Sequence, residues 1–380
     1  MPSIVDAAAT WILSAACVAL IGATLLPRLR LGRWWVRVFD FPKLQLAAVA
    51  AGLALVTAAF ASLHAWETSD SVLVSVFTLA AIWNAGHMLP FTVLWRREIP
   101  ASDPPHHDDD LTLVVANVRV DNDARAEVEG ALRTIDPDIL LVIEIDDAWA
   151  HALETYAATF PHRVDVPRPD GLGLALWSKA PMSDTRVRHL ISEKRPSIWA
   201  TLDTPGGTPL RFVGVHPTPP GLDDDTGDGK RDSRVRDAEL VRLADEVAAQ
   251  NDDAWMIAGD FNDVAWSHTT RLFKRLSGLL DPRVGRRLLT TYHAQRPHLR
   301  FPVDHVFLSP ALSIGDLSRV RLAGSDHFAI VARVRVTSGA RPSPTPSDSD
   351  HEEKHEVIEE GVRDARSRGV DAPLAPAKPC

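Results

Sequence analysis

Apolar and polar positions follow three different patterns along the chain, and each pattern predicts a different kind of structure. Residues 1–100 hold three long apolar runs, residues 101–337 hold short apolar runs separated by amphipathic stretches, and residues 338–380 are rich in Pro, Ser, Asp and Glu. Long apolar runs are typical of membrane helices, short ones of buried strands, and Pro-rich polar sequence of linkers and tails. The chain therefore divides into a membrane region, a folded domain and a tail.

The three apolar runs near the N-terminus are each about as long as a bilayer core is thick. They cover residues 7–26, 44–63 and 71–95. About 20 apolar residues form a helix that crosses the hydrocarbon core. We therefore expect residues 1–98 to form a transmembrane region with three helices. The first ten residues contain no Lys or Arg, which does not fit a cleavable signal peptide, so the region should be retained.

Basic residues crowd the connection between the first and second apolar runs, whereas the second connection carries none. The first connection holds Arg28, Arg30, Arg33, Arg37 and Lys43. Because Lys and Arg accumulate in cytoplasmic loops, this asymmetry predicts a multi-pass protein of the cell membrane whose folded domain is cytoplasmic. Trp34 and Trp35 would also suit a helix in the membrane interface, and the extracytoplasmic placement of the domain stays as the alternative.

The central part of the chain alternates strand-like and helical patterns. A linker is expected at residues 99–110, which are rich in Pro and Asp, and a folded domain at residues 111–337. Apolar strand-like runs cover residues 111–118, 139–145, 173–178, 197–202, 210–216, 255–260, 303–309 and 327–336. Amphipathic stretches cover residues 123–134, 233–249 and 267–277. This alternation predicts an α/β domain in which helices cover sheets.

Charge and cysteine content narrow the functions that fit. The net charge is +2 for residues 1–100, −8 for residues 101–337 and −3 for residues 338–380, and the acidic middle argues against non-specific duplex binding. Cys17 and Cys380 imply neither a disulfide framework nor a thiolate metal site. The tail, residues 338–380, is predicted to be disordered with a transient helix near residues 352–366.

Polar side chains gather at the ends of the predicted strands, where layered α/β folds build their sites. They are Asn117, Glu144, His216, Asp260, Asn262, Asp304, Asp326 and His327. A set of carboxylates, amides and imidazoles without cysteine suits a hard cation and phosphoryl transfer to water. A zinc site would favour several His or Cys at close spacing.

These residues stand in segments that resemble the endonuclease/exonuclease/phosphatase superfamily, the family of deoxyribonuclease I. The segments are Val-Ala-Asn117, Val-Ile-Glu144, Gly-Val-His216-Pro, Gly-Asp260-Phe-Asn262, Val-Asp304-His305 and Gly-Ser325-Asp326-His327. The resemblance covers residues 111–337 and implies a four-layered α/β sandwich, here preceded by three transmembrane helices. The chain also resembles a bacterial membrane-anchored subgroup, through Trp34-Trp35-Val36-Arg37 and the following Phe41-Pro42.

The resemblance implies a metal site and a substrate contact. It makes Glu144 the main ligand of Mg²⁺, with Mn²⁺ as the alternative ion, places Asn117 close by, and leaves Asp326 available to the same or a second ion. Arg195 is a weak candidate for binding the substrate phosphate. His305, adjacent to the site on a strand, should face the opposite side.

The resemblance also assigns catalytic roles. His327 corresponds to the catalytic histidine, and Asp304 to the carboxylate that orients and charges it. His216 is the candidate general acid for the leaving oxygen. Asp260 would orient or deprotonate the attacking water, and Asn262 would donate hydrogen bonds to the non-bridging phosphate oxygens.

The predicted function is metal-dependent hydrolysis of phosphodiester bonds by a membrane-anchored enzyme with a nuclease-like site. The alternatives are a phosphatase or phosphodiesterase acting on a phospholipid or other phosphomonoester, and a catalytically silent membrane scaffold. The expected partners are a phosphate ester, either nucleic acid or a lipid headgroup, and the bilayer; the sequence indicates no protein partner. Ile143 replaces the Gln that many members carry, and Tyr156 and Tyr292 are the only tyrosines, which argues against abasic-site repair.

Overall fold

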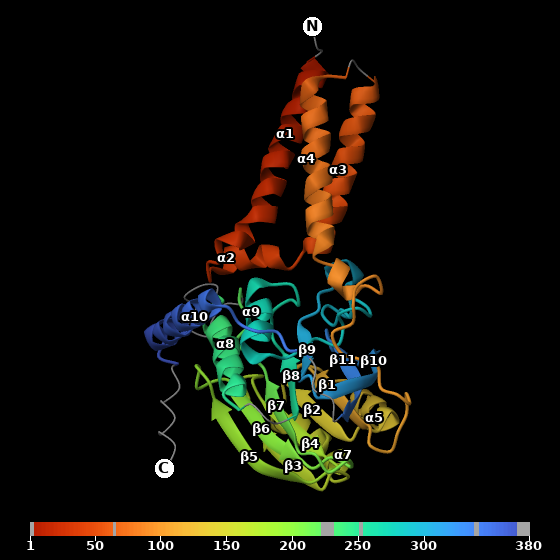
Figure 1. Ribbon diagram of the computed structural model, residues 1–380, viewed down its shortest axis with the longest axis vertical. Coiled ribbons are helices and arrows are strands. Elements are labelled where there is room, and N and C mark those ends of the chain that lie inside the picture. The colour runs from red at the N-terminus through yellow and green to blue at the C-terminus, as the bar shows by residue number, and fades with distance from the viewer. Residues whose placement is uncertain (1–3, 64–65, 222–231, 251–253, 338–341, 371–380) are drawn as a thin grey trace.

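Three long helices stand on a larger α/β domain in the computed structural model, which describes residues 4–63, 66–221, 232–250, 254–337 and 342–370 (Figure 1). The helices are α1 (Ile4–Leu25), α3 (Lys43–Leu63) and α4 (Thr68–Gly86). Helices α3 and α4 lie side by side, and α1 contacts both of them. The N-terminal region is therefore a small helical bundle that projects from the domain.

Two of these helices are long and apolar enough to cross a membrane. In the described part of the chain these are the stretches Ala7–Leu29 and Lys43–Leu63. Only 22% of the apolar window in each is buried, so neither resembles the core helix of a soluble protein. Helix α4 does not meet the same criterion, and the expected count of three spans is not supported by length and composition.

The third helix also ends earlier than predicted. The predicted range of residues 71–95 becomes helix α4, which ends at Gly86, and the 3₁₀ turn η3 (Leu89–Phe91). Pro90 explains the end, because a proline ring clashes with the carbonyl four residues earlier and removes a helix hydrogen-bond donor.

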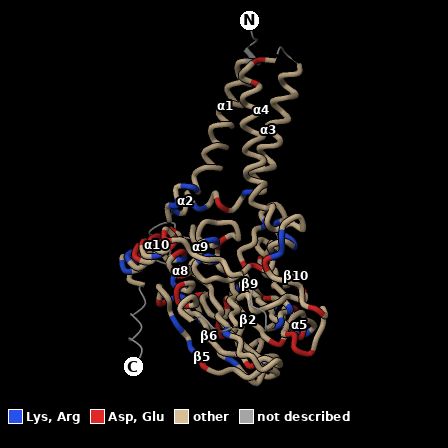
Figure 2. Tube along the Cα trace, viewed as in Figure 1, with Lys and Arg blue, Asp and Glu red and all other residues tan. Residues whose placement is uncertain are grey.

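A short irregular segment joins α1 to α3 and lies across the top of the α/β domain (Figure 1). It consists of η1 (Leu26–Leu29), α2 (Trp34–Arg37) and η2 (Val38–Asp40). Lys and Arg gather along this segment at the base of the bundle (Figure 2). Arg37 is buried and lies 3.4 Å from carboxylate oxygens of both Asp40 and Asp237, so the segment is fixed to the domain by buried ion pairs.

The domain contains two β-sheets. The first has the order β10-β11-β1-β2-β4-β3 and the second the order β5-β6-β7-β8-β9. The strands of the first sheet are β1 (Leu111–Asn117), β2 (Ile139–Ile143), β3 (His162–Val166), β4 (Leu174–Ser178), β10 (Leu312–Arg321) and β11 (Phe328–Val336). Those of the second are β5 (Met182–His189), β6 (Pro196–Leu202), β7 (Leu210–Val215), β8 (Ala254–Asp260) and β9 (Asp304–Leu308).

The two sheets pack face to face, and helices cover their outer faces. Leu113 of β1 and Phe212 of β7 belong to one apolar cluster between the sheets, whereas Val114 and Ala116 of β1 pack against the outer helices. Both faces of β1 are therefore buried, which explains its uninterrupted apolar sequence. The outer helices are α5 (Arg125–Ile135), α6 (Asp147–Ala152) and α7 (Glu154–Ala157) on the first sheet, and α8 (Arg234–Ala248) and α9 (His268–Ser277) on the second. The predicted α/β fold is confirmed as four layers around two sheets.

The eight predicted strands are present, but three others are not evident in the sequence. These are β3, β5 and β10, which lie at sheet edges. β5 reads Met-Ser-Asp-Thr-Arg-Val-Arg-His and is largely exposed. An edge strand with one solvated face lacks the apolar run by which the buried strands were identified.

The predicted linker, residues 99–110, contains no helix and no regular strand, but it is docked on the sheet. The side chain of Ile99 is fully buried. Ala101 forms a β-bridge with Ile314 at the edge of β10, and Ser102 donates its backbone N–H to the Ile314 carbonyl at 2.9 Å.

The prediction of a disordered tail is wrong for residues 348–367. They form α10 (Asp348–Ser367), which packs on α8 and α9 (Figure 1). Val357 and Ile358 contact the apolar cluster beneath α8, and Arg275 binds Asp350 at 2.8 Å. The few apolar residues of this segment share one face of a helix, so composition alone concealed a packing surface.

Candidate active site

The polar strand-end residues meet in one cleft between the two sheets. Strands β1 and β2 are parallel, as are β7 and β8, so their carboxyl ends lie at a common edge. Strands β9 and β11 run antiparallel to β8 and β1 and begin at that edge. The cleft has a volume of about 670 Å³ and is lined by Glu144, His216, Asp260, Asn262, Asp326 and His327.

Glu144 enters the cleft from the residue directly after β2. Its backbone takes the left-handed conformation, with φ 65°, which is costly for a residue with a side chain. Its backbone N–H donates to the Gly173 carbonyl at 2.9 Å, which holds the turn. Burial raises the pKa of the Glu144 carboxyl, partly offset by the hydrogen bond from Asn117 and by the positive charge of His327.

Asn117 joins the two sheets at the base of the cleft. Its amide nitrogen donates to Glu144 Oε1 at 2.8 Å and to Asp260 Oδ2 at 3.3 Å. Its oxygen accepts from the backbone N–H of Arg119 at 3.1 Å. The carboxamide therefore presents its amide nitrogen to the two acids and its oxygen to the backbone of Arg119.

His327 and Asp304 form a buried ion pair. Nδ1 of His327 donates to Asp304 Oδ2 at 2.8 Å, and its Nε2 lies 3.7 Å from Asp260 Oδ2. Burial alone would lower the pKa of His327, but the carboxylates of Asp304 and Asp260 outweigh it and raise the pKa to about 10. His327 is thus an imidazolium at neutral pH.

Asp260 lies at the centre of the cluster and titrates near neutral pH. Burial and the nearby Asp304 carboxylate raise its pKa to about 7, against the opposing charge of His327. Its Oδ1 accepts from the backbone N–H of Asn262 at 2.9 Å. Asn262 has φ 51° and donates one amide N–H to the Pro217 carbonyl at 3.0 Å, which leaves a second donor for the cleft.

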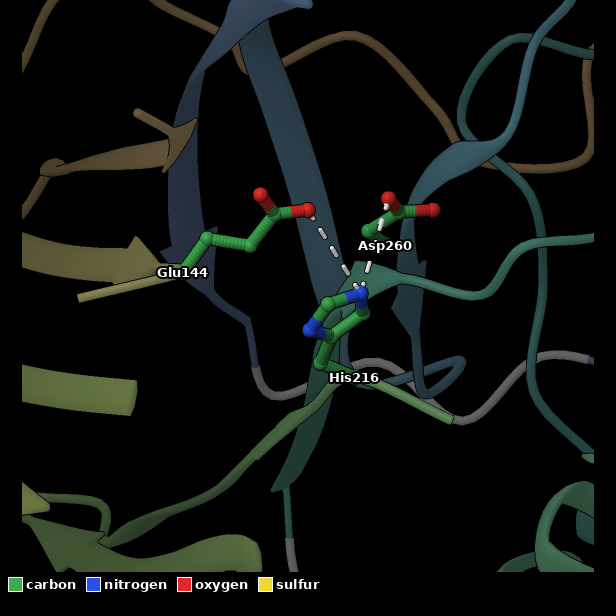
Figure 3. A group of neighbouring side chains, drawn as sticks. All are labelled: Glu144, His216 and Asp260. Atoms are coloured by element: carbon green, nitrogen blue, oxygen red, sulfur yellow. Dashed lines mark ion pairs between the residues drawn. The ribbon is translucent and has the colours of Figure 1, made fainter. Parts of the chain in front are cut away.

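His216 faces both acids from the third side (Figure 3). Its Nε2 lies 3.9 Å from Glu144 Oε1 and 3.9 Å from Asp260 Oδ2. Its Nδ1 is buried and has no hydrogen-bond partner in the part of the chain that is described. Burial, Arg195 and His327 together lower the pKa of His216 well below its usual value, so the imidazole is neutral before substrate binds.

The donor set fits a divalent cation. One ligand atom each from Glu144, His216 and Asp260 lie within 4.8 Å of one another, and Asp260, Asp304 and His327 form a second such group. Burial raises the pKa of both Glu144 and Asp260, because it disfavours their charged forms. A cation bound between them would offset this cost of burying negative charge. Asp326 lines the same cleft and adds negative charge near Glu144.

Two predicted neighbours have supporting positions. Arg195 is buried, lines the cleft and donates from its Nη1 to the His216 carbonyl at 3.5 Å. His305 points away from the cleft as expected: its Nδ1 accepts from Arg283 at 2.6 Å and its Nε2 donates to the Asp263 carbonyl at 2.8 Å.

Several buried residues that hold the site were not identified from the sequence. Arg236 of α8 donates to the Asn262 carbonyl at 2.7 Å and to Asp237 Oδ1 at 2.7 Å. Glu239 accepts from the backbone N–H groups of Ser192 and Thr218, which border the His216 loop. The sequence around Arg236 and Glu239 does not distinguish them from surface residues of a helix. Only the folded structure shows which loop they contact.

Comparison with known proteins identifies the class. The sequence model of the Endonuclease/Exonuclease/phosphatase family matches residues 114–327, and the chain belongs to this family. Members are hydrolases that act on phosphoester bonds and generally use divalent metal ions, which supports a phosphoesterase function. No curated protein matches the chain.

Solved structures show similarity over the same domain at low identity. An endonuclease/exonuclease/phosphatase from Beutenbergia cavernae is 18% identical, with a TM-score of 0.47 over 61% of this chain and 74% of that one. The human Nocturnin catalytic domain with bound sulfate is 16% identical, with a TM-score of 0.47 over 60% and 95%. D. rerio TDP2 with a single-strand DNA product is 16% identical, with a TM-score of 0.45 over 60% and 100%.

Proposed function

We propose that this chain is a membrane-anchored, metal-dependent phosphoesterase that hydrolyses phosphodiester bonds. The observation that supports this most is the meeting of Glu144, His216, Asp260 and the charged His327 in one cleft, although they lie on four separate segments of the chain. Two acids, a neutral imidazole and an imidazolium within a few ångströms can bind a cation, handle a proton and stabilise phosphate charge.

Glu144 and Asp326 are the residues that would hold the cation, with Asn117 beside them and donating to both Glu144 and Asp260. Mg²⁺ is the proposed ion and Mn²⁺ the alternative, because the available donors are mainly carboxylate oxygens. When bound, the cation supplies Lewis-acid neutralisation of the phosphate oxygens.

The remaining residues transfer protons or stabilise the charge on the phosphate. Asp260, with a pKa of about 7, accepts a proton from the attacking water. His327 carries a fixed positive charge that opposes the charge developing on the phosphoryl oxygens, and Asn262 donates its free amide N–H to them. His216 faces the leaving oxygen; an anionic substrate favours its protonated form, so it can act as the general acid once substrate is bound.

The placement at a membrane rests on α1 and α3. Both are apolar over the length of a bilayer core, and most of their surface is exposed outside the bundle. We propose a multi-pass anchor completed by α4, with the domain on the cytoplasmic side, because Arg28, Arg30, Arg33 and Arg37 follow the first span.

Hydrolysis of a phospholipid headgroup or another phosphomonoester is the second candidate. The observation that favours it is the anchor itself, because the domain follows the helical bundle in the chain and lies at one end of it (Figure 1). Such tethering raises the local concentration of membrane substrates over soluble ones.

The test is a substrate panel with the full-length protein in detergent micelles. Bis-p-nitrophenyl phosphate, plasmid DNA, RNA and phospholipid are each incubated with Mg²⁺ or with EDTA. The proposal expects hydrolysis of the diester and of nucleic acid in Mg²⁺ and none in EDTA. Hydrolysis of lipid alone would select the second candidate, and no hydrolysis of any substrate would leave the scaffold alternative.

A further inference from the structure

A second cavity lies where the helical bundle meets the α/β domain. Its volume is about 780 Å³, and it shares no lining residue with the catalytic cleft. Its walls come from the end of α1, the connecting segment, the start of α3, the end of α4 and the turn after it, and helix α9. Its lining includes Arg28, Asp40, Lys43, Trp83, Trp95 and Arg271. We call it the junction cavity.

Three cations face the junction cavity, and the Asp40 carboxylate attracts two of them, Lys43 and Arg271, without a direct ion pair among the described residues. Among the described residues, Arg28, Lys43 and Arg271 form no ion pair with a carboxylate, and only 3% of Lys43 is exposed. Lys43 lies near enough to Arg28 and Arg271 to feel their repulsion, and Arg271 feels that of Arg28. The guanidinium of Arg28 lies 4.4 Å from the ring centroid of Trp83, a contact that leaves its charge uncancelled.

The acids in the same walls are already bound to other cations. Asp40 lies 3.4 Å from Arg37. Asp281 lies 2.8 Å from Arg283, and Glu98 lies 2.6 Å from Lys274. The junction cavity is therefore lined by five Lys and Arg side chains against three acids, and those acids are engaged by cations of their own. Gathering like charges in a partly desolvated space is unfavourable unless an anion joins them.

The position of the cavity indicates which anion fits. It lies at the domain end of the two apolar helices, where Figure 2 shows the Lys and Arg of the connecting segment, and Trp83 and Trp95 are both half-exposed beside it. Tryptophan at the end of an apolar helix marks the headgroup level of a membrane. A lipid phosphate at that depth would face the three cations.

We propose that the junction cavity binds the phosphate group of an anionic phospholipid, held by Arg28, Lys43 and Arg271. The proposal rests on the membrane anchoring proposed above and is independent of the catalytic residues. Charged hydrogen bonds from Lys and Arg to phosphate are strong, and clustered basic residues next to a membrane span favour anionic lipids over zwitterionic ones. The contact would set the domain against membranes rich in anionic lipid.

The test measures binding of short-chain phosphatidylglycerol, phosphatidylcholine and inorganic phosphate to the full-length protein in neutral detergent. The wild type should bind phosphatidylglycerol in preference to phosphatidylcholine. Lys43→Gln with Arg271→Gln should weaken phosphatidylglycerol binding by about fivefold for each cation removed. The matched control is Arg163→Gln with Arg186→Gln, two exposed arginines on the distant strands β3 and β5, which should leave the preference unchanged.

Two results would overturn the proposal: equal binding of the two lipids by the wild type, or an unchanged preference in the Lys43 and Arg271 variant. Inorganic phosphate that displaces phosphatidylglycerol at equal concentration would assign the cavity to free phosphate instead. Single Arg271→Gln is measured alongside in case the double variant misfolds. Hydrolysis of bis-p-nitrophenyl phosphate and flotation with phosphatidylcholine vesicles, measured on the same samples, separate failure of this site from failure of catalysis or of anchoring.

Discussion

At the scale of single residues, the charge on His327 depends on Asp304. The pKa of His327 is about 10 because Asp304 and Asp260 overcome the effect of burial. Below that pH the imidazolium persists, so the loss of kcat/KM that comes from His327 should appear only as pH rises through about 10. Asp304→Asn removes the main source of this shift and should lower kcat by about 10²–10⁴-fold while moving the alkaline limb toward the ordinary value near 6.5.

The pH–rate profile of the Asp304→Asn variant measures this directly. Asp316→Asn is the matched control, because Asp316 is exposed on β10 and lies outside the cleft. An alkaline limb that stays in place in the Asp304 variant would show that this carboxylate does not set the charge of His327.

The sequence located the acids and imidazoles of the cleft but not their orientations. Glu144, Asp260 and His327 each follow or precede a buried apolar strand, which predicts a shared edge of the sheets. Asn117 was expected near the metal, yet its amide nitrogen, not its oxygen, meets the two carboxylates. Which atom of an amide faces a neighbour depends on the backbone of Arg119, a contact that the pattern of residues does not encode.

At the scale of elements, α8 supports the catalytic loop through buried charge. Arg236 is 1% exposed, holds the Asn262 carbonyl and lies 3.6 Å from the Asp263 carboxylate. Arg236→Met would leave Asp263 buried without its cation and Asp237 with only Arg37 at 3.4 Å, and losing one partner of a buried pair typically costs about 3–5 kcal/mol. We expect a lower free energy of unfolding and a lower kcat, because Asn262 loses its anchor.

Chemical denaturation and steady-state kinetics check both effects. Arg242→Met, on the same helix, is the matched control; Arg242 is 38% exposed and pairs with Glu246 within the helix. A variant at Arg236 that matches this control in stability and kcat would contradict the supporting role of the buried network.

Helix α10 is a second element whose role became evident only in three dimensions. It packs on α8 and α9, and the residues that follow it, Arg368 and Val370, line the catalytic cleft. Truncation after residue 346 should lower Tm by about 5 °C or more, since it uncovers Val357 and Ile358 and breaks the Arg275–Asp350 pair. It should also change KM, because it removes part of the cleft wall.

Differential scanning fluorimetry measures the change in Tm, and truncation after residue 370 is the control because it retains α10 and Val370.

The tail was predicted to be disordered because Pro, Ser, Asp and Glu dominate it. The stripe formed by Val357, Ile358 and Val362 is too short to identify without the surface of α8 against which it packs. An unchanged Tm after removal of α10 would mean that its packing contributes little.

At the scale of the whole molecule, the architecture joins a helical bundle to a four-layered domain through Arg37 and its buried acids. If α1 and α3 cross a bilayer, the full-length protein should float with phosphatidylcholine vesicles and stay with them in alkaline carbonate, which strips peripheral proteins. A chain that carbonate releases would contradict the anchor while leaving the catalytic site untouched. The sequence predicted α1 and α3 as membrane-spanning helices, because a run of about 20 apolar residues is enough to identify such a helix.

The central claim is that acids from separate strands hold one catalytic cation, and the Mg²⁺ dependence of hydrolysis by a Glu144→Gln variant tests it most directly. Rates on bis-p-nitrophenyl phosphate are measured over a Mg²⁺ titration for the full-length wild type, for Glu144→Gln and for Glu127→Gln, whose carboxylate is exposed on α5. We predict saturable Mg²⁺ activation in the wild type and the Glu127 variant, and activity reduced by about 10²-fold or more, with weakened Mg²⁺ activation, in the Glu144 variant. Wild-type rates and Mg²⁺ dependence in the Glu144 variant would contradict the account.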